Sequence, residues 1–327
     1  GNNAMKNLTR KMITAGMAAT MAASLGIAAN AEEATYKVGI CQLIQHEALD
    51  AATQGFQDAL TEKLGDRVEF DVQNASGESV NCSTIINGFV SDQVDLILAN
   101  ATGALQAAVA GTSDIPILGT AVTDYATALD IDDWTGTVGG NVSGTSDCAP
   151  LDQQAAMILE LVPEAKTVGM LYCSAEPNSE YQVNVVTEAL KELNPDLEIK
   201  NYTFADSNDI SSVATSATEC DVVYIPTDNT AANNTEAINN VMEPAGVPVI
   251  AGEAGICQGC GIATLSISYY DLGYTTGEMA YEILEEGADI STMEVQYAPN
   301  VTKQYMADRC EKLGITVPDD YEAIEAE

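Results

Sequence analysis

The sequence has 327 residues, of which 46% are hydrophobic, and its 12 Lys and Arg against 49 Asp and Glu give a formal net charge of −37 at pH 7. This charge excludes nucleic acid as a partner and disfavours anionic lipid headgroups, because both would be repelled. The apolar fraction is large enough for a substantial core. After residue 31 no apolar segment is long enough to span a membrane.

The N-terminal segment has the pattern of a secretory signal. A basic stretch from Met5 to Lys11 precedes an uncharged run of small and apolar residues from Met12 to Ala29. Ala29-Asn30-Ala31 then gives a small-x-small cleavage pattern, and we expect the mature chain to start near Glu32. Residues 1–4 are read as a cloning remnant, and no Cys near residue 31 signals lipid attachment. We therefore expect a secreted protein, periplasmic or at the extracellular face of the membrane.

Cysteine and histidine usage argues against a metal site. The chain has eight Cys, and export would permit disulfides, but most of them lie inside apolar segments, where buried free thiols fit equally well. Cys257 and Cys260 have CxxC spacing, yet no second Cys pair or His pair completes a zinc set, since His46 is the only histidine. We expect neither a metal nor a cofactor.

An internal repeat defines the architecture. The chain after the signal, roughly 300 residues long, exceeds the usual size of one domain and predicts two. Strands alternate with amphipathic helices, and three strands recur in the same order in both halves. The pairs are Thr35–Cys41 with Thr167–Tyr172, Asp95–Ala99 with Asp221–Ile225, and Ile115–Leu118 with Val247–Ile250. The duplicated order predicts two lobes of the same design.

Strand–helix alternation predicts an α/β fold in which each half is a Rossmann-like lobe with a parallel sheet covered by helices. Ligands of such sheets bind beyond the carboxyl ends of the strands, so two facing lobes would form a binding cleft. Helix Leu272–Leu284 is expected to return to the first lobe, and strand Met293–Tyr297 and helix Lys303–Leu313 to the second. The expected boundaries are 32–146 plus 265–292 for the N-terminal lobe and 147–264 plus 293–327 for the C-terminal lobe, with three hinge crossings near Ser146, Leu265 and Ala298.

Four motifs resemble one known family over almost the whole mature chain. They are Gly39-Ile40-Cys41-Gln42 with His46-Glu47-Ala48-Leu49-Asp50, Thr120-Ala121-Val122-Thr123-Asp124, Pro226-Thr227-Asp228-Asn229-Thr230, and Ser268-Tyr269-Tyr270-Asp271-Leu272-Gly273. The chain resembles the ABC transporter substrate-binding proteins of the type I periplasmic-binding fold, within the group associated with tryptophan and tyrosine uptake. It departs from that group at Glu47, where Pro is usual, and at Cys257 and Cys260.

The resemblance implies an extracytoplasmic solute-binding protein of an ABC importer. Such a protein captures an amino acid, here with an aromatic or large apolar side chain, in a cleft between lobes joined by three strands. The implied partners are the ligand and an ABC permease, and the expected state is a monomer whose lobes close on the ligand.

Polar residues at strand ends are the candidates for holding an amino acid. For the ammonium we expect Asp228 first and Glu253 second. For the carboxylate we expect Thr102, at the start of an Ala-rich helix, and Asn178 and Ser179 at the corresponding junction of the second half. Thr102, Asn178, Ser179 and Asp228 could instead only cap helices, and Glu253 could be a solvated loop charge.

The remaining candidates come from strand ends and from the motifs of the resemblance. Tyr172 and Tyr269 could form the wall of an aromatic pocket, although such tyrosines often simply pack in a core. His46 is expected as a contact from the first loop, and Gln42 and Thr123 as further ligand contacts from the family motifs.

The sequence offers no support for an enzyme. No GxSxG, Walker A or strand-following GxGxxG motif is present, and a Ser-His-Asp or Cys-His site could use only His46. Two alternatives remain open: a binder of another small metabolite, such as a sugar or nucleoside, on the same fold, and a ligand-sensing ectodomain. We expect transport rather than sensing, because no signalling module follows Glu327.

Overall fold

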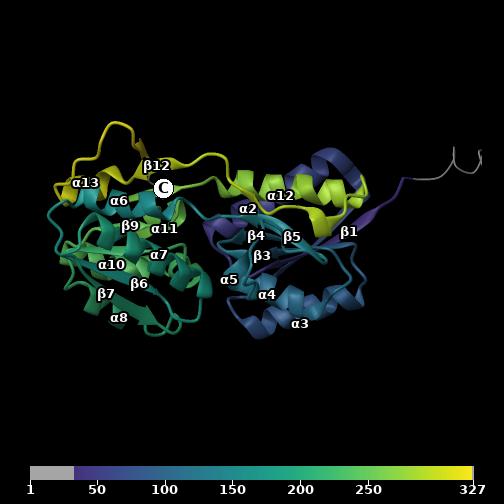
Figure 1. Cartoon of the computed structure of the whole chain (residues 1–327), viewed down its shortest axis with the longest axis horizontal. Helices are drawn as coiled ribbons and strands as arrows, with labels where there is room; N and C mark the ends of the chain where they lie inside the picture. Colours follow the sequence, from purple (N-terminus) through teal and green to yellow (C-terminus); the bar gives the residue numbers. More distant parts are fainter. Residues whose placement is uncertain (1–32, 326–327) are drawn as a thin grey trace, which may run out of the picture. The chain divides into compact units, whose positions relative to one another are not determined.

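The computed structural model describes residues 33–325. The predicted signal peptide, its cleavage point and the remnant at residues 1–4 lie outside the described residues. Two β-sheets, each with its own helices, organise the described part (Figure 1). No helix within this range is long and apolar enough to cross a membrane.

The first sheet has six strands, all parallel to their neighbours, in the order β11-β5-β4-β3-β1-β2. Its strands are β1 (Tyr36–Gln42), β2 (Val68–Asn74), β3 (Leu96–Asn100), β4 (Ile117–Val122), β5 (Val142–Ser146) and β11 (Gln296–Tyr297). One face is covered by α2 (Glu47–Leu64) and α12 (Tyr269–Leu284), the other by α3 (Ser79–Ser91), α4 (Thr102–Gly111) and α5 (Tyr125–Leu129). Because both faces are covered, β3 and β4 are buried along their whole length.

The second sheet has seven strands in the order β13-β12-β10-β9-β8-β6-β7, and only the β10–β12 pair is antiparallel. Its strands are β6 (Thr167–Cys173), β7 (Glu198–Phe204), β8 (Val222–Ile225), β9 (Val249–Ala251), β10 (Ala263–Ser266), β12 (Thr302–Tyr305) and β13 (Glu322–Ala323). Its helices are α6 (Leu151–Leu161), α7 (Pro177–Leu193), α8 (Ile210–Ala217), α9 (Asn229–Ala232), α10 (Thr235–Ala245), α11 (Ala254–Cys260) and α13 (Ala307–Lys312). Two short 3-10 helices lie elsewhere in the chain, at Gly65–Arg67 after α2 and at Ile290–Thr292 after α12. The central strands β8 and β9 are fully buried, because helices cover both faces of the sheet.

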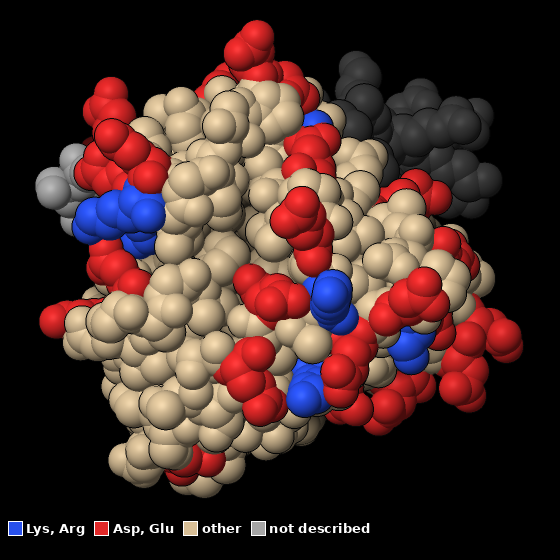
Figure 2. All heavy atoms as spheres, turned by 90° about the vertical axis from the view of Figure 1, so that its left-hand side faces the viewer, with Lys and Arg blue, Asp and Glu red and all other residues tan. Residues whose placement is uncertain are grey.

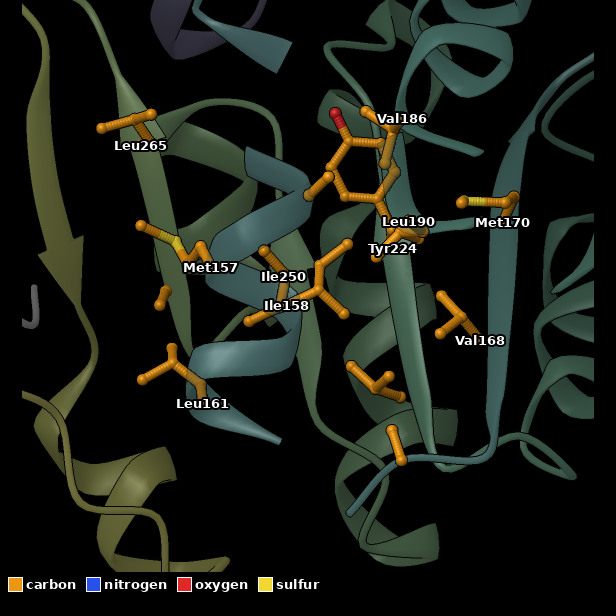
Figure 3. Packing of buried hydrophobic residues seen from close by; sticks show 14 of the residues in the cluster. Met157, Ile158, Leu161, Val168, Met170, Val186, Leu190, Tyr224, Ile250 and Leu265 are labelled. Atoms are coloured by element: carbon orange, nitrogen blue, oxygen red, sulfur yellow. The ribbon is translucent and has the colours of Figure 1, made fainter. Parts of the chain in front are cut away.

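The core of the second lobe is built from the apolar faces of α6 and α7 packed on the sheet. Figure 3 shows Met157, Ile158 and Leu161 of α6 directed toward side chains of the sheet. Tyr224 lies fully buried among them, and its hydroxyl donates to Gln154 Oε1 at 2.5 Å. The buried hydroxyl therefore has the partner that a tyrosine in an apolar core needs.

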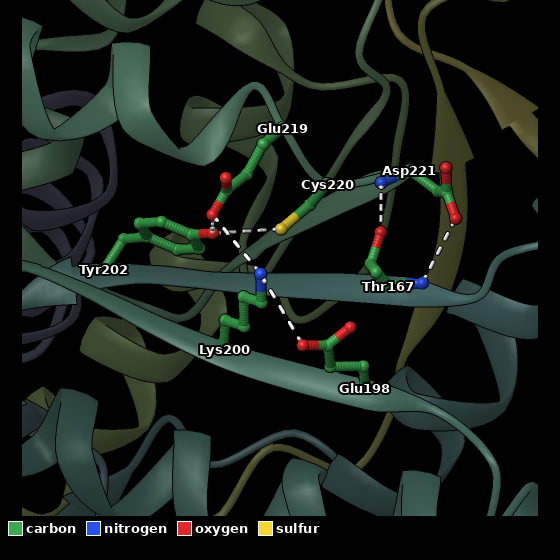
Figure 4. A network of polar contacts seen from close by, with 7 residues as sticks. All are labelled: Thr167, Glu198, Lys200, Tyr202, Glu219, Cys220 and Asp221. Carbon is green, nitrogen blue, oxygen red and sulfur yellow. Dashed lines mark hydrogen bonds and ion pairs between the residues drawn. The ribbon is translucent and has the colours of Figure 1, made fainter.

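The free edge of this sheet at β7 carries charges. Lys200 on β7 lies 3.6 Å from Glu198 and 3.5 Å from Glu219, and the Tyr202 hydroxyl donates to Glu219 (Figure 4). Charged side chains on an edge strand oppose pairing with a second chain. Acidic groups also outnumber basic ones across the face drawn in Figure 2, as the composition requires.

Helices α2 and α12 touch through glycines. A Cβ placed at Gly273 would lie 1.9 Å from the carbonyl oxygen of Ala52, and one at Gly55 would lie 2.1 Å from the carbonyl oxygen of Tyr270. The backbones are therefore too close for any side chain at these positions. This contact fixes α12, and with it Tyr269 at its first turn, against the first sheet.

The structure confirms the α/β fold with two parallel-sheet lobes, including the three repeated strand pairs. Two local predictions are wrong. Residues 296–297 pair with β5 of the first sheet rather than belonging to the second lobe. Residues 303–305 form strand β12 instead of helix, because they pair antiparallel with β10. The chain leaves the second sheet after Ser266, next to the crossing expected near Leu265. The lobe boundaries as a whole stay a prediction.

Candidate functional site

A buried carboxylate, Asp147, follows the carboxyl end of β5. Its side chain is only 4% exposed. One carboxylate oxygen accepts a hydrogen bond from Thr123 Oγ1 at 3.1 Å and the other accepts from the Tyr269 hydroxyl at 2.7 Å. Thr123 follows β4 of the same sheet, and Tyr269 opens α12, so three segments converge on this carboxylate.

Glu253 brings a second buried carboxylate to this region from the other sheet. It follows β9, is 2% exposed, and accepts a hydrogen bond from the backbone N–H of Ile256, which makes it the N-cap of α11. The negative charge of Asp147 contributes to a raised pKa of Glu253. The charges of Asp147 and Glu253 both contribute to a raised pKa of Tyr269. Thr123, Asp147, Glu253 and Tyr269 are named here the acidic cluster.

The electrostatics of the acidic cluster leave its negative charge uncompensated. Burial raises the pKa of Asp147, although the hydroxyls of Tyr269 and Thr123 oppose the shift. Burial also raises the pKa of Glu253 to about 7, and the charges of Glu47 and Asp147 add to this effect. Among the described residues no Lys or Arg forms an ion pair with Asp147 or Glu253. A buried carboxylate without a cationic partner favours binding of a cation.

The raised pKa of Glu253 predicts a pH-dependent stability. The folded protein binds the proton of Glu253 more tightly than the unfolded chain does, in which the pKa of this side chain is 4.5. Its contribution to stability is therefore complete below pH 4.5 and is lost as the pH rises through about 7. Titration of Glu253 should lower the unfolding free energy of the wild type by about 3 kcal/mol between pH 4.5 and 7. We expect Glu253→Gln to lack this decrease.

Urea unfolding of ligand-free protein at a series of pH values measures this difference. Glu192→Gln, at an exposed position of α7, serves as the control and should leave the wild-type pH profile unchanged. Parallel profiles for wild type and Glu253→Gln would show that Glu253 titrates normally.

Asp228 has a different environment from the one the sequence suggested. It is 1% exposed, and its two oxygens accept from Ala231 N at 2.8 Å, Cys173 N at 2.8 Å and Ser179 Oγ at 2.7 Å. Two of these donors are backbone groups, one of them at the first turn of α9. Asp228 and Ser179, predicted to hold opposite ends of a ligand, are thus bonded to each other, and the contacts of Asp228 favour a capping role.

Replacing Asp228 with Ala is expected to lower stability more than ligand affinity. The change removes the cap of α9 and leaves the N–H groups of Cys173 and Ala231 without their acceptor. We expect a loss of roughly 2–4 kcal/mol in the unfolding free energy and an affinity change of less than about threefold. Denaturant unfolding and calorimetric titration measure the two effects, and Ser179→Ala, which removes one donor, should cost about 1 kcal/mol. Unchanged stability with a hundredfold weaker affinity would instead restore Asp228 as the ammonium ligand.

The other residues predicted to hold the ligand's carboxylate come from both lobes. Thr102 is 3% exposed at the first position of α4, and the preceding residue, Ala101, has φ 92°. The Asn178 amide donates to Thr227 O at 3.2 Å, which ties α7 to the loop after β8. Asn178 and Ser179 both donate to protein acceptors. The Thr102 hydroxyl makes no hydrogen bond to another described residue.

Two predicted contacts are engaged inside their own lobe. Gln42 donates to Ile44 O at 2.9 Å and to Asp50 Oδ1 at 2.7 Å, and accepts from Thr53 Oγ1 at 2.7 Å, so it fixes the loop between β1 and α2. Tyr172 is 7% exposed and packs in the core of the second lobe. The structure does not bring these two side chains to the acidic cluster.

His46 joins segments attached to different sheets. Its Nε2 lies 2.9 Å from Asn229 Oδ1, and Asn229 opens α9 directly after β8. Two hollows lie beside this contact, one of about 570 Å³ lined by His46, Glu253 and Arg309, and one of about 520 Å³ lined by Leu43, Asn178 and Asn229. Both are lined by residues of the two lobes.

Sequence reasoning missed Asp147, Thr227, Glu176 and Asn229 as members of the site region. A signal existed for Asp147, since it directly follows the segment identified as a hinge crossing near Ser146. In the described residues, no group of three His, Cys, Asp or Glu is placed to hold a metal ion.

Comparisons with known proteins agree with this architecture. The family model described as ABC transporter substrate binding protein matches residues 37–326. A curated tyrosine-binding protein of Clostridioides difficile (strain R20291) is 37% identical over 252 residues, which make up 76% of this chain and 72% of that protein.

Two solved structures are similar over most of the chain. An ABC domain in complex with L-Trp from Streptococcus pneumoniae superposes with a TM-score of 0.84 at 29% identity and covers 89% of this chain and 100% of its own. A ligand-free, open substrate-binding protein with adhesive properties from Clostridium difficile is 34% identical but has a TM-score of 0.68, covering 90% of this chain and 100% of its own. The chain therefore superposes better on the complexed relative, although the open one is closer in sequence.

Proposed function

Because the chain belongs to the ABC transporter substrate-binding protein family, we propose that it captures a free amino acid with an aromatic or large apolar side chain outside the cell membrane and delivers it to an ABC importer. Members of this family are binding proteins and not enzymes, which agrees with the sequence. The relatives named for tyrosine and crystallised with L-Trp support the ligand class.

The observation that carries the proposal is the uncompensated acidic cluster where the two sheets meet. Asp147 and Glu253 come from different sheets, are both buried, and have no Lys or Arg partner in the described chain. An α-ammonium group supplies one positive charge and three donors in a small volume, which suits two carboxylates whose oxygens each keep acceptor capacity. We assign the ammonium to Asp147 and Glu253.

The ligand's carboxylate would lie at the start of α4. The backbone N–H groups of the first turn of this helix and the Thr102 hydroxyl are donors at its positive end. Asn178 and Ser179, the other residues predicted from sequence, already donate to protein acceptors, so they contribute less to this role. A zwitterion held in this way bridges the two lobes.

Lobe closure on the ligand follows from the same arrangement. The ammonium is held from both sheets, so the interaction is complete only when the lobes approach each other. The higher TM-score against the L-Trp complex than against the open relative supports a closed arrangement for the described chain. We propose that the protein acts as a monomer at the outer face of the membrane and that its second partner is the permease.

A thermal-shift screen tests the ligand class. Protein unfolded and refolded to remove bound ligand is mixed with the twenty amino acids, common sugars and nucleosides. L-Tyrosine or L-tryptophan should raise the melting temperature by several degrees at concentrations well above the dissociation constant. Stabilisation by a sugar or a nucleoside, and by no amino acid, would favour a binder of another metabolite on the same fold.

A further inference from the structure

Two hydrogen bonds connect the loop after β1 to the α9 region across the lobes. The first joins His46 Nε2 to Asn229 Oδ1 at 2.9 Å. In the second, Asn233 Nδ2 donates to Gln45 O at 2.6 Å. Loop residues 43–46 follow β1 of the first sheet, while Asn229 and Asn233 follow β8 of the second sheet. These four residues are named here the clasp.

The direction of the first bond follows from the partners of Asn229. The Asn229 amide nitrogen donates to Glu176 Oε1 at 2.9 Å, and a carboxylate oxygen only accepts. The amide oxygen of Asn229 therefore faces His46, and His46 must carry its proton on Nε2. His46 Nδ1 is buried and has no hydrogen-bond partner in the described chain, so a proton there would have no acceptor. The geometry requires the neutral Nε2–H tautomer.

Both sides of the clasp are held rigid within their own lobe. On one side, Gln42 donates to Ile44 O and Asp50, which fixes the loop that carries His46. On the other side, Glu176 accepts from the backbone N–H of Asn229 at 3.0 Å and from that of Thr230 at 3.0 Å. A bond between two pre-fixed partners loses little side-chain entropy when it forms.

The clasp lies between the two hollows that border the inter-lobe region. His46 lines the first, Asn229 lines the second, and Asn233 lines both. Neither clasp bond involves a residue of the acidic cluster, although Glu253 of that cluster lines the same hollow as His46. Opening the lobes at this point requires both clasp bonds to break.

We propose that the clasp locks the lobes after the ligand has entered, with His46 as the positioning residue that sets the rate of ligand release. The proposal rests on the proposed function, because it assumes that an amino acid is held between the lobes. His46 then acts on the lifetime of the closed complex and not through contact with the ligand. The ligand enters before the clasp forms, so the association rate is unaffected.

Surface plasmon resonance with L-tyrosine and L-tryptophan separates the two rates. We expect His46→Ala to speed dissociation roughly tenfold with an association rate within about twofold of wild type, since one interlobe hydrogen bond is lost. His46→Gln, whose amide N–H can still donate to Asn229, should restore most of the lifetime. Asn233→Ala should speed dissociation by a few fold, and Asn240→Ala, at an exposed position of α10, should have no effect.

The result that would overturn the clasp is equally specific. A His46→Ala variant that lowers the association rate and leaves dissociation unchanged would make His46 a ligand-entry contact. Equal dissociation rates for wild type, His46→Ala and Asn233→Ala would show that neither clasp bond slows ligand release.

A second measurement tests the clasp at the His46 ring itself, in protein with the amino acid bound. His46 is the only histidine, so in protein free of a histidine tag its ring nitrogens give a single set of NMR signals. The groups that face this ring are Asn229, Glu176 and Asp50. Burial lowers the pKa of His46, although the hydrogen bond to Asn229 and the charges of Glu176 and Asp50 oppose the shift. We expect a dominant Nε2–H tautomer that persists below pH 6.5.

The two measurements distinguish failure of the clasp from failure of the proposed function. If neither amino acid binds wild type, the proposed function fails and the locking role fails with it, and the imidazole signals then report only whether the His46–Asn229 bond forms. If the amino acid does bind, a His46 ring without tautomer preference, titrating at the ordinary pKa of 6.5 in the complex, would contradict the clasp. The Nε2–H tautomer in the complex, lost on Asn229→Ala, would support it.

Discussion

Asp147→Asn is expected to weaken amino-acid binding by about a hundredfold or more. The substitution removes the buried negative charge to which we assign the ligand's ammonium, and loss of one partner of a buried charge pair costs roughly 2–5 kcal/mol. The new amide can still accept from Thr123 or Tyr269 through its oxygen, so the local packing is kept. Isothermal titration with L-tyrosine and L-tryptophan measures the effect.

Two controls make the Asp147 result specific. Tyr269→Phe removes one hydrogen bond to Asp147 while retaining its charge, and should weaken binding only about tenfold. Stability of ligand-free Asp147→Asn should equal or exceed that of wild type, because the buried carboxylate is uncompensated without a ligand. Binding by Asp147→Asn as tight as by wild type, with its fold intact, would place the ammonium elsewhere, and Glu253 would then be the remaining carboxylate to test.

Gly273→Ala is expected to lower the unfolding free energy by roughly 3–5 kcal/mol. The added methyl group would meet the carbonyl oxygen of Ala52 at 1.9 Å, and backbone atoms cannot turn away as a flexible side chain can. Helices α2 and α12 would have to separate, which weakens their packing on the first sheet. Denaturant unfolding followed by circular dichroism measures the loss.

The matched control is a glycine in a helix that faces open space. Gly88 lies in α3, and a Cβ added there would have no atom within 4 Å, so Gly88→Ala should be neutral or stabilise by up to about 1 kcal/mol. A Gly273→Ala protein as stable as wild type would show that the two helices can separate without cost.

The repeated strands could be predicted because their burial leaves a direct trace in the sequence. The apolar runs of β3, β4, β8 and β9 are set by helices on both faces of each sheet. Strands at or near an edge carry a weaker trace. β7 alternates polar and apolar residues, and β12 reads as the start of a helix until its pairing with β10 is known. The two-residue strand β11 is defined by its partner β5 alone.

Three members of the acidic cluster could be predicted from sequence as candidates, but their hydrogen-bond partners could not, and their role in binding stays a prediction. The carboxyl ends of the strands were the expected location, and Thr123, Glu253 and Tyr269 do lie together there with Asp147. Whether a carboxylate is free for a ligand depends on its donors. Asp228 accepts from three protein groups, one of them Ser179 and another the N–H of Cys173, 55 positions away in the chain, and such partners are not visible in a linear sequence. His46 likewise gains its partner Asn229 only when the lobes meet.

Calorimetric titration of ligand-stripped wild-type protein with L-tryptophan and L-tyrosine tests the central claim most directly. The account predicts binding of one molecule per chain in the micromolar range or tighter for at least one of the two, together with loss of this binding when the α-ammonium is absent, as in indole-3-propionate or 3-(4-hydroxyphenyl)propionate. A protein that binds neither amino acid, or binds the ammonium-free analogues equally well, would contradict it.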